Sequence, residues 1–206
     1  IYKSLNLASE YIHDSILNKN ESIWIAQKQG RSKDGNDYTD PSVIKMIHLN
    51  ARKKIPINKY LNSLNVVPVS ISYEKDPNDV RKANELYLTD LNQEYIKEPK
   101  EDLISIAEGI RGQKGNVHLH VGKVINFTND SYEQCSDEIT LAIKSEYKNH
   151  ATNYAAAIIQ GKNTNMGSFS NHDIDRAVNY LTAKTNEMPE EMQAYFLTQY
   201  SRSLEL

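Results

Sequence analysis

The chain has 206 residues, with 24 Lys and Arg against 27 Asp and Glu, so its formal net charge is −3. A chain of this length fits one domain, or one domain with an appendage, and is long enough to bury a sizeable core. The slightly acidic balance argues against a general nucleic-acid binder, although it leaves room for a local basic patch. The single cysteine, Cys135, rules out an internal disulfide, and no apolar run approaches the ~20 residues of a transmembrane helix.

The first part of the chain predicts short helices and two strands. Trp24 lies in a short apolar run, which indicates a buried strand. Asp40 followed by Pro41 is typical of a helix start, because Asp caps free N–H groups and Pro suits the first helical position. Pro68 cannot donate a ladder hydrogen bond, so its strand should lie at a sheet edge or a bulge. The expected elements are helix 1–19, strand 22–27, helix 41–49, helix 57–64 and strand 65–73.

The middle of the chain predicts two more helices and a third strand. Asp79 is expected to cap the first of these helices. In the strand, Val117, Leu119 and Val121 alternate with polar residues, which is typical of a half-buried strand. The expected elements are helix 80–92, helix 100–111 and strand 116–125, and the three strands of the chain should share one sheet.

The last part of the chain carries only helical periodicity, with no strand pattern after residue 150. Ser170 or Asn171 should cap one helix and Pro189 should begin another. The predicted fold class is therefore α/β: a mixed sheet with packed helices in residues 1–149, followed by an all-helical C-terminal appendage in residues 150–206.

A metal site and a nucleophilic cysteine are the next candidates, and each is weighed against a purely structural role. His118 and His120 share one face of a strand, but two ligands are too few for a metal site, so we favour a solvated or hydrogen-bonded strand face. Cys135 has no catalytic-triad signature around it, which favours a structural thiol over a nucleophile.

A polar loop between Gln27 and Asp37 is a stronger candidate for binding. Gly30 lets backbone N–H groups approach an anion, while Arg31 and Lys33 supply positive charge. The alternative is a basic surface loop that simply precedes a helix.

The run from Ile25 to Asp37, IAQKQGRSKDGND, resembles the third motif of a bacterial branch of the glycerophospholipid acyltransferases, the lysophosphatidate and glycerol-3-phosphate acyltransferases. The run from Leu64 to Tyr73 resembles the family's fourth motif, a strand that holds a proline. Weaker similarity continues through Gly115 to His120. The two motifs occur in the family's order and at its spacing.

The resemblance implies transfer of a fatty acyl group from acyl-CoA or acyl-carrier protein to a hydroxyl of glycerol phosphate or lysophosphatidate, without a cofactor or metal. In the family, a His and an Asp five positions later act as general base and orienting group. None of the six histidines here has an Asp at that spacing, so the pair is expected upstream of residue 1.

The resemblance assigns the acceptor phosphate to Gln29, Gly30, Arg31 and Lys33. Gln29 stands where the family has Glu, so it offers hydrogen bonds but no charge. Arg31 follows the glycine directly, whereas many members have one residue between them, so either Arg31 or Lys33 is the phosphate ligand. An Arg guanidinium binds phosphate through two parallel hydrogen bonds, which Lys cannot offer.

The resemblance also implies a place in the cell and partners. We expect phospholipid synthesis in the cytoplasm or at the cytoplasmic face of the membrane, with contact to the membrane surface through parts outside this chain and no nucleic-acid partner. The alternative function is a non-catalytic binding or interaction module on an acyltransferase frame, with the helices after residue 150 docking a partner.

Overall fold

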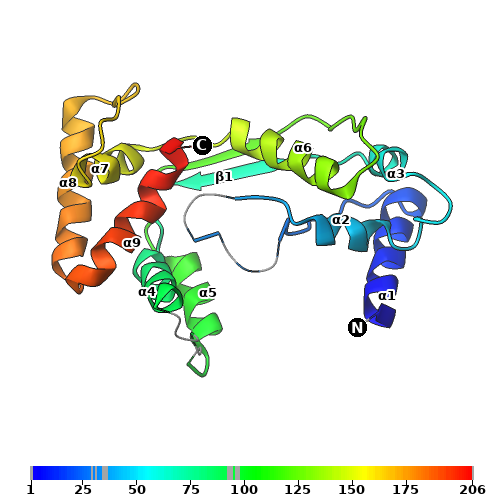
Figure 1. Cartoon of the computed structure of the whole chain (residues 1–206), viewed down its shortest axis with the longest axis horizontal. Helices are drawn as coiled ribbons and strands as arrows, with labels where there is room; N and C mark the ends of the chain where they lie inside the picture. Colours follow the sequence, from blue (N-terminus) through cyan, green and yellow to red (C-terminus); the bar gives the residue numbers. More distant parts are fainter. Residues whose placement is uncertain are drawn as a thin grey trace. The chain divides into compact units, whose positions relative to one another are not determined.

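The computed structural model describes residues 2–28, 30, 32–33, 37–91, 95 and 98–205. It shows a mostly helical protein, 57% helix and 5% strand, with a small two-stranded antiparallel sheet (Figure 1). The prediction of a strand at residues 22–27 is wrong, because this segment has no regular structure and Trp24 is 73% exposed. None of the helices within the described ranges is long and apolar enough to cross a membrane.

The chain forms two compact units. The first comprises residues 1–31, 37–70 and 119–147, and the second comprises residues 32–36, 71–118 and 148–206. The predicted division into domains at residue 150 stays a prediction.

The described residues of the first unit form four α-helices. They are α1 (Tyr2–His13, continued by a π-helical turn Asp14–Asn18), α2 (Pro41–His48), α3 (Ile57–Ser63) and α6 (Tyr132–Ser145). Tyr60 and Leu61 of α3 are almost fully buried among apolar residues of α2 and α6, which makes α3 the centre of this core. The helix expected from the apolar stripe of residues 1–19 is confirmed, and its Ile12 reaches the same core.

The second unit holds the remaining helices among the described residues. They are α4 (Asp79–Asp90), α5 (Glu101–Arg111), α7 (Ala151–Ile159), α8 (Asn171–Asn186) and α9 (Glu190–Ser201), followed by a 3-10 turn, Arg202–Glu205. Ala155 and Ala156 of α7 are fully buried, and such small side chains allow neighbouring helices to approach closely. Phe196 of α9 and Leu181 of α8 belong to the same core. The described residues after residue 150 form helices and no strand, so the predicted all-helical C-terminal part is confirmed.

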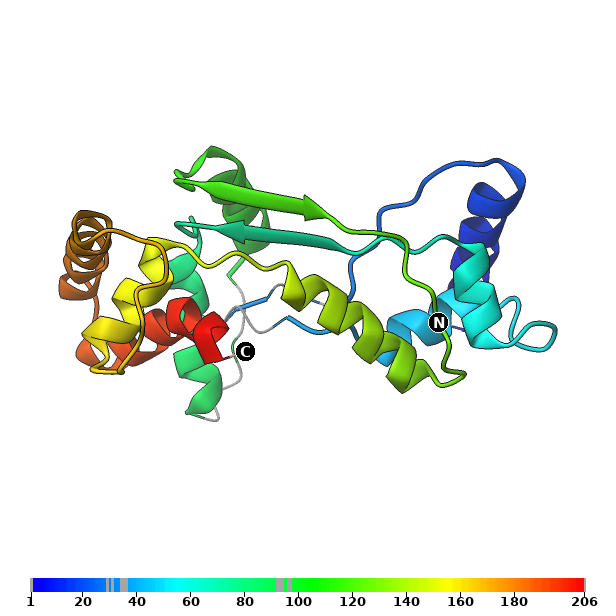
Figure 2. The ribbon, with the colours of Figure 1, turned by 90° about the horizontal axis from the view of Figure 1, so that it is seen from above.

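The sheet pairs β1 (Val69–Tyr73) with β2 (Val117–Val121), as Figure 2 shows. Its apolar side chains face outward, contrary to the expectation of a buried apolar face: Val117, Leu119 and Val121 are 52%, 59% and 63% exposed. On the covered side, Ser70 and Ser72 of β1 are 2% exposed. The alternation was predicted correctly, but the covered side carries small polar residues instead of the apolar ones.

Local start signals placed most helices correctly. Asp40 caps α2, where its carboxylate accepts a hydrogen bond from the Ser42 N–H at 2.8 Å, and Ser170 caps α8. Asp79 was wrongly expected as a cap, because Asn78 occupies the N-cap position of α4. The Asp79 carboxylate is used by residues far along the chain instead.

Candidate functional site

The loop that precedes α2 is closed at its base in the first unit. The Asp40 N–H donates to the Gln27 carbonyl at 2.8 Å, and the Thr39 hydroxyl donates to the Gln27 side chain at 2.9 Å. The Thr39 N–H donates to the Thr140 hydroxyl of α6 at 2.8 Å, and Thr39 is 4% exposed. These bonds hold Gln27 beside Thr39 and Asp40, so the two ends of the loop lie side by side.

Lys28 is the first basic residue of this loop, and its charge is already compensated. Its ammonium lies 2.8 Å from the Asp37 carboxylate and 4.4 Å from the centroid of the Tyr38 ring. The side chain of Lys28 is only 13% exposed, so the pair is partly shielded from water. Lys28 therefore stabilises the closed base of the loop.

Two of the four residues predicted to bind phosphate, Gln29 and Arg31, lie outside the described residues. Gly30 is described: it is exposed and has φ +80°, a left-handed conformation that favours glycine. A Cβ at Gly30 would meet nothing within 4 Å, so the glycine serves the backbone conformation and does not make room for a neighbouring group.

Lys33, the fourth predicted residue, belongs to the second unit and pairs with α4. Its ammonium lies 2.6 Å from the Glu85 carboxylate, and the two side chains are 33% and 18% exposed. A ligand phosphate would have to compete with this carboxylate for the same ammonium. The Lys33 ammonium is therefore not freely available to a phosphate group in this structure.

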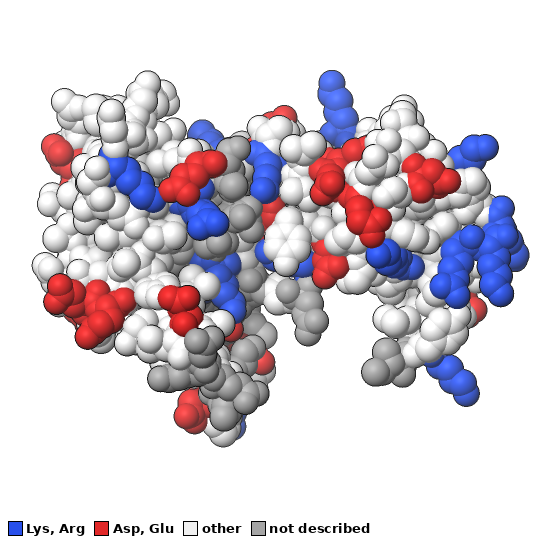
Figure 3. Space-filling model, viewed as in Figure 1, with Lys and Arg blue, Asp and Glu red and all other residues white. Residues whose placement is uncertain are grey.

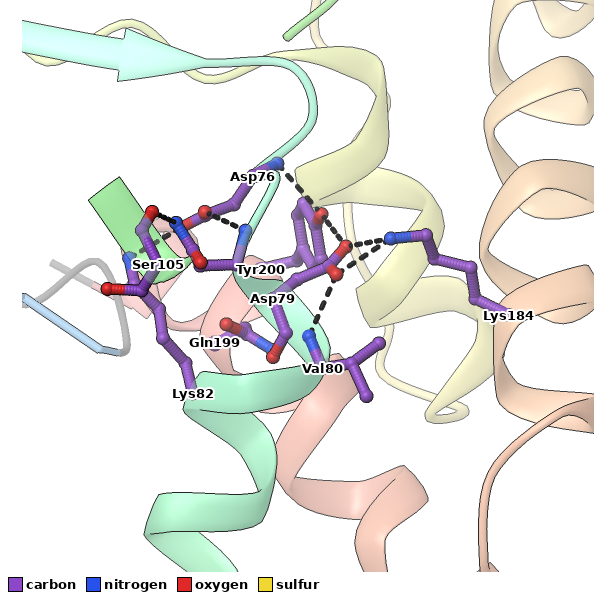
Figure 4. A network of polar contacts seen from close by, with 9 residues as sticks. Asp76, Asp79, Val80, Lys82, Ser105, Lys184, Gln199 and Tyr200 are labelled. Carbon is purple, nitrogen blue, oxygen red and sulfur yellow. Dashed lines mark hydrogen bonds and ion pairs between the residues drawn. The ribbon is translucent and has the colours of Figure 1, made fainter. Parts of the chain in front are cut away.

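Asp79, at the start of α4, organises the polar centre of the second unit (Figure 4). The carboxylate is 1% exposed, and the Lys184 ammonium of α8 donates to both of its oxygens, at 2.7 and 2.6 Å. The Tyr200 hydroxyl of α9 donates to the same carboxylate at 2.7 Å, and the Val80 N–H donates to it at 2.8 Å. Three helices are therefore held at one buried carboxylate.

The groups around Asp79 are saturated with partners inside the chain. The Tyr200 hydroxyl also accepts a hydrogen bond from the Asp76 N–H at 3.1 Å, and Gln199 donates to the Asp79 carbonyl at 2.9 Å. Asp76 in turn pairs with Lys82. Since every one of these groups already has a partner, the network stabilises the fold and offers no vacant position to a substrate.

The pKa shifts follow from this arrangement. Burial raises the pKa of Tyr200 well above its ordinary value, and the negative charge of Asp79 adds to the effect. For Lys184, burial acts to lower the pKa, but hydrogen bonding and attraction to Asp79 outweigh it, so the pKa is raised. Both groups thus keep their protons more firmly in the folded protein.

Ser72 and His150 form a serine–histidine contact, with 3.2 Å between the Ser72 hydroxyl and Nε2 of His150. The hydroxyl donates its one hydrogen to the Lys148 carbonyl at 2.7 Å, so that hydrogen is not directed to His150. Burial lowers the pKa of His150, and the Ser72 and His150 side chains are both buried. A nucleophile needs its proton directed to the base and access to substrate, so this pair is structural.

The histidine pair and the single cysteine were expected from the sequence to be structural. His118 and His120 lie on one face of β2, partly buried, and Nδ1 of His120 is 3.7 Å from the Glu146 carboxylate. Among the described residues, no group of three His, Cys, Asp or Glu could hold a metal ion. Cys135 is buried; burial raises the pKa of its thiol to about 11, and the thiol donates to the Asn129 carbonyl at 3.3 Å. A thiol with a raised pKa is a poor nucleophile.

No protein-family model matches the chain, and neither a curated protein nor a solved structure was found to be similar to it.

Sequence reasoning missed the partners that decide which basic residues are available. Glu85 lies 52 positions after Lys33 and Lys184 lies 105 positions after Asp79, so no local pattern connects them. The basic run from Arg52 to Lys54 was visible in the sequence, but only the folded chain shows the pocket that it lines.

Proposed function

We propose that this chain is part of a glycerophospholipid acyltransferase, in which it supplies the loop that holds the phosphate of the acyl acceptor. One structural observation supports this proposal: the loop bearing Gly30 is closed at its base by the hydrogen bonds of Gln27 with Thr39 and Asp40. A loop whose two ends are already held together loses less conformational entropy when it takes up a ligand. The motif resemblance supplies the chemistry that this geometry would serve.

In the proposed reaction, a His outside these 206 residues removes the proton of the acceptor hydroxyl, and an Asp beside it orients the ring. The hydroxyl oxygen attacks the thioester carbonyl of acyl-CoA or acyl-carrier protein, the carbon–sulfur bond breaks, and the thiol leaves with the proton. Arg31 or Lys33 holds the acceptor by its phosphate, so the contribution of this chain is positioning. No cofactor or metal takes part.

The small sheet and the cellular location are part of the same proposed enzyme. We infer that β1 and β2 belong to a larger mixed sheet in the complete enzyme, in which another part of the protein covers the outward-facing Val117, Leu119 and Val121. The enzyme would act in the cytoplasm or at the cytoplasmic face of the membrane, with membrane contact through other parts of the protein. The substrate is a glycerophospholipid precursor, and nucleic acid is not a partner.

The decisive first test is the full reading frame. A His and an Asp five positions apart upstream of Ile1 would support the enzyme, whereas their absence would favour a non-catalytic binding or interaction module. The pairing of Lys33 with Glu85 favours that second function, because it removes one basic group from the loop. The present chain alone should show no acyltransferase activity.

Kinetics of the complete enzyme test the loop itself. Arg31→Ala removes a charge-assisted contact on the order of 1.5–3 kcal/mol, which corresponds to a roughly ten- to hundredfold higher KM for the phosphorylated acceptor. The KM for the acyl donor should stay nearly unchanged. Arg31→Lys should restore only part of the affinity, because an ammonium has no planar fork.

Lys33→Ala is the matched comparison for Arg31→Ala. If Lys33 is the ligand, its removal raises the acceptor KM more than Arg31→Ala does, and Glu85→Gln lowers the KM because it releases the ammonium. If none of these substitutions alters acceptor kinetics while the fold stays intact, the segment is a basic surface loop and the site assignment is wrong.

A further inference from the structure

A pocket of about 360 Å³ lies at the turn between α2 and α3, within the first unit. We name it the basic pocket, and Figure 3 shows Lys and Arg side chains gathered on the surface of this unit. Its lining includes His48, Arg52, Lys53, Lys54, Asp130 and Tyr132.

The turn that carries the three basic residues is held in place by its own backbone. The Arg52 N–H donates to the His48 carbonyl at 2.9 Å, and the Lys54 N–H donates to the Ala51 carbonyl at 2.8 Å. Ala51 is 4% exposed and belongs to the core of the unit. The backbone positions from which the basic side chains extend are therefore fixed.

A buried histidine fastens this turn to α6. His48 is 3% exposed, and its Nε2 lies 2.8 Å from the Ile55 carbonyl, which can only accept, so Nε2 carries a hydrogen. In the neutral ring, Nδ1 then accepts from the Tyr132 hydroxyl at 2.9 Å. His48 and Tyr132 thus form a hydrogen-bonded wall that does not depend on a ligand.

The positive charge of the basic pocket is not compensated within the described part of the chain. Arg52, Lys53 and Lys54 are exposed and form no ion pair with a described carboxylate, unlike Lys45, which lies 2.9 Å from Glu133. The one carboxylate of the lining, Asp130, accepts from the N–H of Ile57 at 3.0 Å. Three cations against one carboxylate leave two net positive charges in the lining.

We propose that the basic pocket binds the phosphate group of a phosphomonoester. A phosphomonoester near neutral pH carries between one and two negative charges, which matches the uncompensated charge. The Arg52 guanidinium offers a bidentate fork and the two ammonium groups offer point charges, the combination that recognises phosphate oxygens. The same group occurs on a soluble sugar or glycerol phosphate and on a phosphatidate headgroup. The proposal does not depend on the proposed function, because the pocket uses none of the residues of the loop before α2.

Titration calorimetry of the 206-residue chain with inorganic phosphate and with glycerol 3-phosphate tests binding of the free group. Sedimentation with phosphatidylcholine vesicles, with and without phosphatidate, tests binding of the headgroup. We expect saturable binding in at least one arm, and the arm that saturates identifies the source of the phosphate.

The double variant Arg52→Ala, Lys54→Ala should weaken that binding at least tenfold. The matched control is Lys3→Ala, Lys123→Ala, which removes the same charge from two exposed positions of the same unit and should leave the affinity unchanged. Arg52→Lys keeps the charge and removes only the fork, so a partial loss is expected, with unchanged circular dichroism showing that the fold is intact.

Three results would overturn the proposal. They are the absence of saturation in both arms, an equal loss of affinity in the double variant and its control, and binding of a nucleic-acid duplex in preference to every phosphomonoester probe.

Discussion

Asp79→Asn tests whether one buried ion pair holds the helices of the second unit together. The substitution preserves the shape of the side chain, and its carbonyl oxygen still accepts from Tyr200. It removes the negative charge to which Lys184 donates at 2.7 and 2.6 Å. The ammonium of Lys184 is then left in a partly buried position without a counter-charge.

The expected loss of stability follows from the burial of the two partners. Removing one member of a buried ion pair typically costs about 3–5 kcal/mol. The side chain of Lys184 is 29% exposed, so its ammonium keeps some contact with water and we expect a value near the lower end, about 3 kcal/mol. This would be a large share of the ~5–15 kcal/mol that stabilises a typical domain.

Urea unfolding followed by far-UV circular dichroism measures this loss. The matched control is Glu133→Gln, which makes the same carboxylate-to-amide change in an exposed pair with Lys45, where the side chains are 62% and 51% exposed. Exposed pairs contribute little, so the control should leave the midpoint nearly unchanged. If Asp79→Asn shifts the midpoint no more than Glu133→Gln does, the Asp79 carboxylate does not hold the helices of the second unit together.

Three further outcomes are expected. Stability should fall as the pH rises above about 10, because folding raises the pKa values of Lys184 and Tyr200 above their ordinary 10.5 and 10.0. The stabilisation is complete below the ordinary pKa values and is lost as the pH rises through the higher pKa values of the folded protein. Unchanged urea midpoints from pH 9 to 11 would contradict this. Cys135 should react with a thiolate-specific reagent roughly a hundredfold more slowly than a free cysteine, because its pKa of about 11 lies two units above the ordinary 9.0. Unfolding in urea should restore the reaction rate. Fast labelling of the native protein would count against the burial of Cys135. Limited proteolysis should cut first between Gly161 and Gly167, a polar, largely exposed loop, and earlier cutting elsewhere would refute this.

Helix starts were the most predictable part of the fold, since their signals are local. Asp40 with Pro41, Ser170, and Pro189 each mark a start that the structure confirms within a residue. A capping side chain bonds an N–H two or three positions away, so the interaction is contained in the sequence window that reveals it.

The strand expected around Trp24 shows where local patterns are insufficient. An apolar run predicts a buried strand only if another strand pairs with it and another layer covers it. Here the segment has no strand partner, and Trp24 and Ile25 are 73% and 42% exposed. The same holds for the candidate phosphate loop, where neither the left-handed conformation of Gly30 nor the ion pair of Lys33 with Glu85 was predicted from the sequence.

The sequence by itself determined the periodicity of most elements: where most of the helices before residue 150 lie, that β2 alternates, and that the chain after residue 150 is helical. Only the tertiary structure decided which face of β2 is covered, and which charges are already neutralised within the chain. The physical reason is the separation along the chain between the residues that interact. Helical hydrogen bonds and caps join residues within a few positions, whereas the contacts of Asp79 with Lys184 and Tyr200 join residues more than a hundred positions apart and leave no local trace.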